Sequence, residues 1–120
     1  MLLLAQILTV AVAALHGYFL VLEMFLWTRP LGLKTFRNTP EKAETTRVLA
    51  ANQGLYNGFL AVGLLWGLGS GQWSVVLFFL GCVVAAGLYG AYSVNKRIFF
   101  VQALPAILAI VAISVGVGAT

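Results

Sequence analysis

Residues 73–94 read WSVVLFFLGCVVAAGLYGAYSV and contain no charged side chain. An α-helix needs about 20 apolar residues to cross the hydrocarbon core of a bilayer, so this stretch is long enough to span a membrane. Residues 48–68 and 98–118 are equally free of charge, and residues 2–27 hold one charged residue, Glu23. The sequence therefore predicts an all-α integral membrane protein, with four transmembrane helices over these ranges in an antiparallel bundle.

The overall composition excludes a water-soluble fold. Of all residues, 62% are hydrophobic and 8% are charged, and the mean hydropathy is +1.01. Soluble domains carry about 25% charged residues, and disordered chains are poor in apolar ones. The apolar stretches lack the alternation of membrane β-strands and are too few to close a barrel. We therefore expect a single membrane domain over residues 1–120.

The basic residues indicate how the helices are oriented. The loop 28–47, between the first two spans, carries most of them, and Lys96 and Arg97 lie between the last two spans. The short connection 69–72, on the opposite side, carries none. Because basic loops stay in the cytoplasm, we expect both basic loops inside and both termini outside the plasma membrane.

The loop 28–47 also contains a helix signal. Thr39, Pro40 and Glu41 have the character of an N-cap, a first-turn proline and an early acidic residue. This pattern predicts a helix that begins there and runs without a break into the second span.

Polar side chains inside the spans gather at one level of the bilayer. On the first span, Thr9, His16 and Glu23 recur at the spacing of one helix face. Polar groups are costly inside a membrane, and they mark either functional sites or hydrogen bonds between helices. We therefore predict a polar chamber, open to the cytoplasm, that binds a small or lipophilic molecule. Its candidate ligand-binding residues are His16, Glu23, Asn52, Gln53, Tyr56, Asn57, Tyr89, Tyr92, Gln102, Arg29, Arg47 and Arg97.

Each part of this chamber has an alternative, structural interpretation. Glu23 can extend to the membrane surface and pair with Arg29 or Arg47, and His16 can hydrogen-bond between helices. The polar cluster at 52–57 can also serve only to hold helices together. If Glu23 belongs to the chamber, its carboxylate should share hydrogen bonds with the second span. The expected partners are Asn52, Gln53 or Tyr56.

Known catalytic motifs are missing from the sequence. There is no GxSxG elbow, no phosphate-binding loop and no pair of Cys or His ligands, so we predict no metal site. The basic residues sit in two short loops, which does not suit nucleic-acid binding. Catalytic residues, and whether the protein is an enzyme, are left undetermined by the sequence.

Two motifs carry a family resemblance. The stretches LHGYFLVLEMFLW (15–27) and ANQGLYNGFLA (51–61), followed by two more short spans, resemble a widespread bacterial family of small four-span membrane proteins of unknown function. The resemblance covers the whole chain. It implies a multi-pass protein of the bacterial inner membrane and supplies no activity.

The layout is also similar, more distantly, to the membrane-associated proteins of eicosanoid and glutathione metabolism. Those are four-span homotrimers with an arginine-rich entry to the second span. The resemblance places Arg47, Asn52 and Asn57 among the residues that hold glutathione between subunits, and implies similar positions for Tyr89 and Tyr92. This chain departs from that pattern at two motif positions, Ala50 and Asn57, and its only counterpart of the catalytic arginine is Arg97. Glutathione is therefore the one cofactor that the resemblance suggests.

Small residues favour assembly of several copies in the bilayer. The second span has one close-packing pair at Gly54 and Gly58 and another at Gly63 and Gly67. More such surfaces exist than one bundle needs, which predicts a homo-oligomer, and the distant resemblance favours a trimer. The leading interpretation is a small-molecule-binding membrane protein, with a glutathione-transferase-like enzyme as a special case. The alternative is an oligomeric transporter or channel subunit that uses the intramembrane Glu and His.

Overall fold

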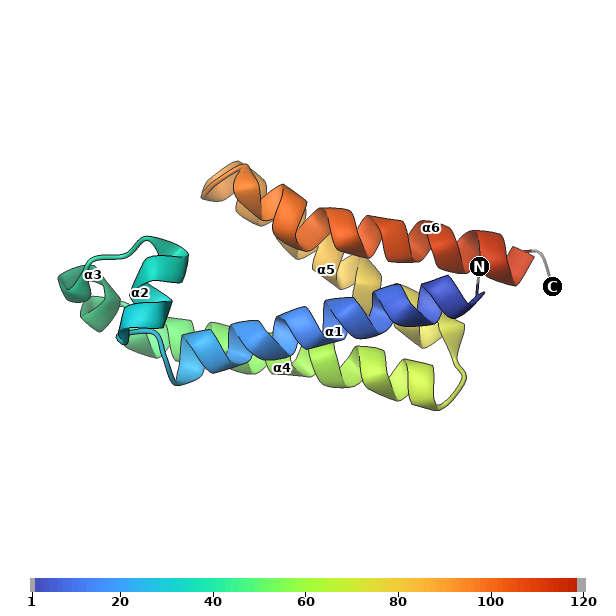
Figure 1. The fold of residues 1–120 in the computed structure, drawn as a ribbon, viewed down its shortest axis with the longest axis horizontal. Helices are drawn as coiled ribbons and strands as arrows, with labels where there is room; N and C mark the ends of the chain where they lie inside the picture. The colour runs from blue at the N-terminus through green and yellow to red at the C-terminus, as the bar shows by residue number, and fades with distance from the viewer. Residues whose placement is uncertain (1, 119–120) are drawn as a thin grey trace. The chain divides into compact units, whose positions relative to one another are not determined.

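The computed structural model describes residues 2–118, and every regular element in this range is helical. The elements are α1 (Leu2–Met24), α2 (Pro30–Phe36), α3 (Pro40–Thr45), α4 (Arg47–Gly69), α5 (Trp73–Ser93), the π-helix η1 (Phe99–Ala103) and α6 (Leu104–Gly118) (Figure 1).

Four helices are long and apolar enough to cross a membrane. They are α1, α4, α5 and the continuous segment formed by η1 and α6. This confirms the predicted all-α class with four helices long and apolar enough to span a membrane.

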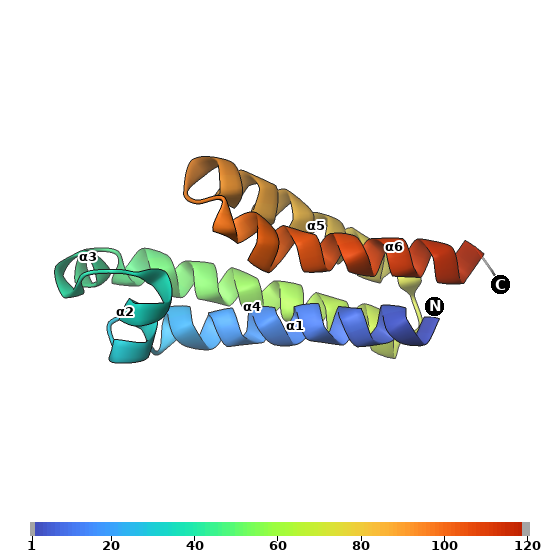
Figure 2. The ribbon, with the colours of Figure 1, turned by 45° about the horizontal axis from the view of Figure 1, so that its top comes forward.

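The chain divides into two compact units. Unit 1 contains residues 2–13 and 62–118 of the described chain, and unit 2 contains residues 14–61. In unit 1, α5 packs along η1 and α6 (Figure 2). The first residues of α1 belong to this unit as well, because Leu2 lies close beside Gly116 of α6.

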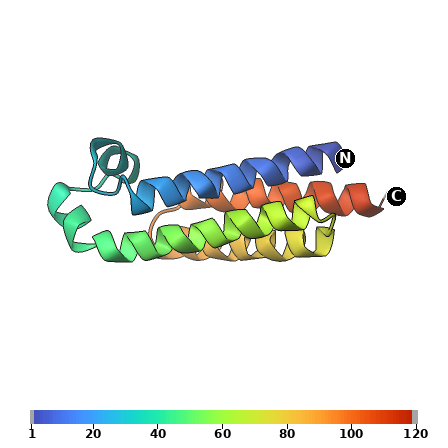
Figure 3. The same ribbon diagram turned by 90° about the horizontal axis from the view of Figure 1, so that it is seen from below.

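Unit 2 holds the second half of α1, the two short helices and the first half of α4. Figure 3 shows α2 and α3 forming the connection between the end of α1 and the start of α4. The α1 and α4 segments approach closely, because a Cβ atom at Gly54 would lie 3.2 Å from the Leu20 carbonyl oxygen and one at Gly58 would lie 2.6 Å from Leu20 Cδ1. Glycine thus brings the two helices into contact at the level of the predicted site.

Helix α1 ends at Met24, before the predicted limit of Trp27. Pro30 disfavours a helical conformation for the residue before it, and Arg29 is extended with φ −87° and ψ 163°. Trp27 leaves the helix and instead packs against Phe36 at a ring distance of 5.0 Å. Its indole Nε1 donates a hydrogen bond to Thr46 Oγ1 at 3.2 Å.

The helix predicted at Thr39 does begin there. Thr39 is the N-cap of α3, and its hydroxyl oxygen accepts the Lys42 backbone N–H at 3.2 Å. The prediction that this helix continues into the second span is wrong, because Thr46 (φ −107°, ψ 7°) separates α3 from α4. The Thr46 hydroxyl donates to the Lys42 carbonyl at 2.8 Å, a back-bonding geometry that bends helices.

The last span begins with a π-helical turn. Pro105 has no backbone N–H and its ring would clash with a carbonyl one turn earlier, so a regular α-helix is unfavourable at this position. In the π-helical turn η1 each backbone hydrogen bond spans five residues instead of four. The Leu104 N–H thus donates to the Phe99 carbonyl. This turn lies against α5, where a Cβ atom at Gly87 would be 2.7 Å from the backbone nitrogen of Ala103.

Candidate binding site on α1 and α4

The centre of the candidate site is the carboxylate of Glu23. Glu23 lies in the last turn of α1 and is 3% exposed. Its Oε2 accepts a hydrogen bond from Gln53 Nε2 at 2.7 Å, and its Oε1 accepts one from Asn57 Nδ2 at 2.5 Å. Gln53 and Asn57 are four residues apart on α4, so they face α1 together. Both carboxylate oxygens are therefore held by one helix face.

Gly54 makes these hydrogen bonds geometrically feasible. A Cβ atom at this position would lie 3.1 Å from the Glu23 Cβ and 2.7 Å from the Met24 Cγ. Any larger residue would push the two helices apart and lengthen the bonds to the carboxylate. The glycine between the two amide residues thus positions the acid.

The expectation that Glu23 shares its carboxylate with the second span is confirmed, and of the three alternative partners, Asn52, Gln53 or Tyr56, the structure selects Gln53. The Asn52 side chain instead donates to the Val48 carbonyl at 2.9 Å, and Tyr56 is 59% exposed beside Phe59. Both residues are exposed, whereas Asn57 is buried. The direction in which a helix face points depends on its packing, which spacing alone does not reveal.

The alternative interpretation of Glu23 as a surface ion-pairing residue is also wrong. Within residues 2–118, Glu23 forms no ion pair, and Arg47 pairs with Glu44 at 3.3 Å. Both side chains of that ion pair are exposed, so the pair adds little to the free energy of unfolding. Arg29 is exposed at the start of α2.

His16 is the second polar residue that α1 buries in unit 2. Its side chain is completely buried and packs edge-on against Phe19, with ring centroids 5.4 Å apart. His16 precedes Glu23 by two helical turns, which places both on the same side of α1. The line of polar residues expected from the spacing is therefore buried along its length in this unit.

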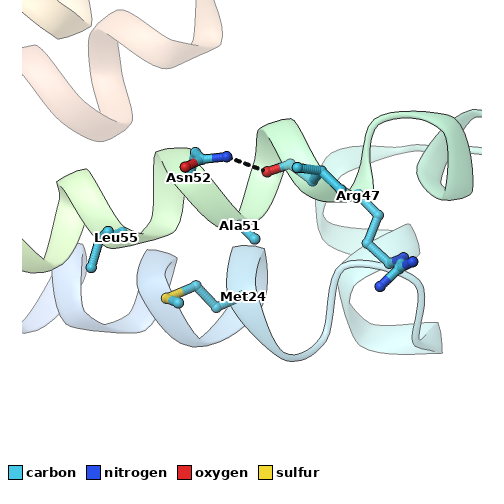
Figure 4. A pocket seen from close by; sticks show the side chains of 6 residues that line it. Met24, Arg47, Ala51, Asn52 and Leu55 are labelled. Carbon is cyan, nitrogen blue, oxygen red and sulfur yellow. Dashed lines mark hydrogen bonds between the residues drawn. The ribbon is translucent and has the colours of Figure 1, made fainter.

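A shallow, open depression lies next to this cluster. It has a volume of about 280 Å³. Its lining residues are Met24, Arg47, Val48, Ala51, Asn52 and Leu55. Figure 4 shows that Met24 borders it from α1 and that the other residues come from α4. Glu23 does not line the depression, although its neighbour Met24 does.

The lining is mixed in character. Its apolar part comes from four residues, and its polar residues are Arg47, whose guanidinium pairs with Glu44, and Asn52, whose amide donates to the Val48 carbonyl. Arg47 and Asn52 were predicted from the sequence, whereas the apolar residues were not. No sequence signal separates such residues from the many apolar side chains that face lipid.

The remaining predicted site residues belong to unit 1. Tyr89 and Tyr92 on α5 are 71% and 88% exposed. Gln102 lies within η1, and the Arg97 backbone N–H donates to Asn95 Oδ1 at 2.8 Å in the preceding turn. Their membership of a common chamber with Glu23 stays a prediction.

The described chain offers no cluster typical of a metal centre. Across residues 2–118, no group of three or more His, Cys, Asp or Glu side chains is placed to hold a metal ion. The chemistry available at the candidate site is that of one carboxylate, two amides, one imidazole and a nearby guanidinium.

Comparison with known proteins identifies relatives of unknown activity. A family model described as "Protein of unknown function (DUF1304)" matches residues 10–114. The "Uncharacterized protein YpaA" of Lactococcus lactis subsp. lactis (strain IL1403) is 33% identical over 115 residues, which cover 92% of this chain and 97% of that protein. No solved structure matches the chain, so the distant resemblance to the glutathione-metabolising membrane proteins stays a prediction. The sequence resemblance to a bacterial family of unknown function is confirmed, and the chain belongs to the DUF1304 family.

Proposed function

We propose that this protein binds a small amphipathic molecule in the depression beside α1 and α4. The observation that carries the proposal is the composition of the lining, in which Met24, Ala51 and Leu55 offer apolar contact next to the polar residues Arg47 and Asn52. Ligand sites are typically apolar hollows with a few polar groups that orient the ligand. An acidic head group beside Arg47, with an apolar body along α4, would use both parts of the lining.

In this proposal Glu23 is a positioning residue. It binds Gln53 and Asn57 but does not line the depression, so it acts by holding α1 and α4 together. Glutathione, the cofactor suggested by the distant resemblance, carries two carboxylates that suit Arg47. Glutathione and a glutathione conjugate with an apolar chain are therefore the first compounds to test.

We further propose that the protein assembles into trimers. Both glycine pairs of α4 are occupied within the chain, since Gly54 and Gly58 contact α1 inside unit 2 while Gly63 faces Phe79 and Gly67 faces Val76 inside unit 1. Support for the proposal comes from other glycines. Gly17, Gly69 and Gly81 meet no atom within 4 Å, which leaves surfaces at which a second copy can approach closely.

A matched pair of substitutions tests the binding proposal. Ala51→Phe should fill the depression and lower the occupancy of S-hexylglutathione or lauric acid at least about tenfold, a change of about 1.4 kcal/mol. Ala85→Phe is the control, because Ala85 is exposed on α5 and does not line the depression. Native mass spectrometry in mild detergent measures both occupancy and the number of copies.

Two outcomes of this experiment would contradict the proposals. Equal occupancy in Ala51→Phe and Ala85→Phe would show that the depression is not the binding site. A mass of 12.8 kDa throughout, that of a single chain, would overturn the trimer while leaving the binding result valid.

We propose that α2 and α3 lie on the cytoplasmic side, as the basic residues of this segment favour. In a Cys82→Ser background, Lys34→Cys should resist a membrane-impermeant thiol reagent in intact cells, and Ser70→Cys should react. Ser70 is preferred to Gly71 because Gly71 has φ +70°, which side chains other than glycine rarely adopt. Labelling of Lys34→Cys from outside would reverse the orientation.

A second candidate function, proton-coupled transport or conduction, is favoured by one observation. Glu23 and His16 are both almost completely buried on one side of α1, and ionisable residues inside membranes commonly serve in proton pathways. The Glu23 variants described in the Discussion distinguish this candidate from the binding proposal.

A further inference from the structure

The charge of the connection between α1 and α4 is concentrated on its first part. From Met24 to Pro40 the chain has three basic residues, Arg29, Lys34 and Arg37, and no acidic one. All three are exposed, and none forms an ion pair within the described chain. By contrast, α3 carries both acidic and basic side chains. The unneutralised positive charge therefore lies on α2 and its flanks.

The inner face of α2 packs against the turn that follows α1. Gly32 is buried, and a Cβ atom there would overlap the Leu26 carbonyl group. Phe36 packs on Trp27, whose indole nitrogen is bound to Thr46. Contacts at both ends of a seven-residue helix fix which side of it faces outward.

The outward side combines basic and apolar side chains. Leu31 is 47% exposed, and Lys34 follows it three residues later on the same helix face. Phe25, in the turn just after α1, is 67% exposed. Together with Arg29 and Arg37, these residues define the α2 surface.

We propose that the α2 surface binds the anionic phospholipid head groups of the membrane leaflet in which α1 ends. Phosphate groups would contact Arg29, Lys34 and Arg37, while Leu31 and Phe25 would enter the boundary with the acyl chains. Apolar residues flanked by Lys and Arg are typical of segments that lie in the membrane interface. Each basic residue near an anionic surface strengthens such binding about fivefold.

This surface serves a purpose different from that of the depression beside α4. None of its residues lines the depression, and α2 contacts Leu26 and Trp27, which do not line it either. The test of lipid binding is therefore independent of the test of small-molecule binding.

Two charge-matched double variants test the proposal. Lys34→Gln with Arg37→Gln removes two charges from the α2 surface, and Lys42→Gln with Lys96→Gln removes two exposed charges elsewhere. Each protein is purified in mild detergent and mixed with equal amounts of dioleoyl phosphatidylglycerol and dioleoyl phosphatidylcholine. Native mass spectrometry then gives the ratio of the two lipids bound.

We expect the unaltered protein to retain phosphatidylglycerol preferentially, and the α2 double variant to lower the ratio about 25-fold, fivefold for each charge. The control double variant should keep the ratio within twofold of the original. An equal drop in both variants, or no drop in either, would overturn the proposal. Displacement of the bound lipid by 10 mM glycerol phosphate would also overturn it, because a soluble phosphate would then be the ligand.

Discussion

Glu23→Ala should destabilise the α1–α4 pair by about 2–4 kcal/mol, because it leaves the side chains of two amides without their common acceptor. Asn57 is 8% exposed and cannot replace the lost bond with water, so most of the cost should arise there. Gln53 is exposed and can rehydrate its amide. The free energy of unfolding, measured by titrating detergent-solubilised protein with SDS, gives the result.

Two double-mutant cycles should measure the energetic contribution of each of the two hydrogen bonds separately. Hydrogen bonds between membrane helices average about 0.6 kcal/mol and reach about 1.7 kcal/mol. We expect the coupling between Glu23 and Asn57 near the upper value, and the coupling between Glu23 and Gln53 near the average. The ranking follows from burial, since a hydrogen bond contributes more where water cannot compete for its partners.

Glu44→Ala is the matched control for Glu23→Ala. Glu44 pairs with Arg47 on the exposed surface of the same unit, and such a pair should contribute less than about 1 kcal/mol. If both alanine variants lose the same stability, the buried carboxylate does not hold the helices together, and the positioning role of Glu23 is wrong.

Glu23→Gln separates the two candidate functions. Glutamine keeps the size of the side chain and one acceptor oxygen, but it cannot carry a proton as a carboxylate does. A proton pathway through Glu23 should lose its flux in liposomes that hold a pH gradient and a pH-sensitive dye. Loss of flux in this variant would support the transport candidate, and flux that Glu23→Gln leaves unchanged would contradict it.

Gly87→Val should be the most destabilising single substitution in unit 1. A Cβ atom at Gly87 would lie 2.7 Å from the Ala103 backbone nitrogen and 3.0 Å from its Cα. Backbone atoms of a helix cannot move as a side chain can, so η1 must shift away from α5. Overpacking typically costs about 1–3 kcal/mol, and we expect the upper end of this range or a loss of folded yield.

The neighbouring glycine supplies the control. Gly81 lies on the same helix, and a Cβ atom there would meet nothing within 4 Å. Gly81→Val should therefore leave the thermal midpoint, followed by circular dichroism in detergent, within a few degrees of the original. Similar losses in both variants would mean that helix propensity, rather than the contact with η1, accounts for the effect.

Several features of the site were predictable because they depend on spacing along one helix. The burial of His16 and Glu23 on the same side of α1 follows from their separation by two turns. The Gln53 partnership was found among three expected partners for Glu23, whereas Asn57 was predicted only as a site residue. Its role as a second partner could have been inferred from its position four residues after Gln53.

Other features depended on contacts between segments distant in sequence. The break at Thr46 involves the Trp27 indole, nineteen residues earlier, so local helix signals after Thr39 could not reveal it. The lining of the depression similarly combines Met24 of α1 with residues of α4 that come much later in the chain.

The sequence by itself determined four helices that are long and apolar enough to span a membrane. That conclusion needs only local information, because backbone groups in lipid must be satisfied within each helix and each span must be about 20 residues long. Only the tertiary structure decided which amides bind Glu23 and which polar residues of α4 remain exposed. Those outcomes depend on the rotation and separation of two helices, which the contacts of Gly54 and Gly58 with α1 set.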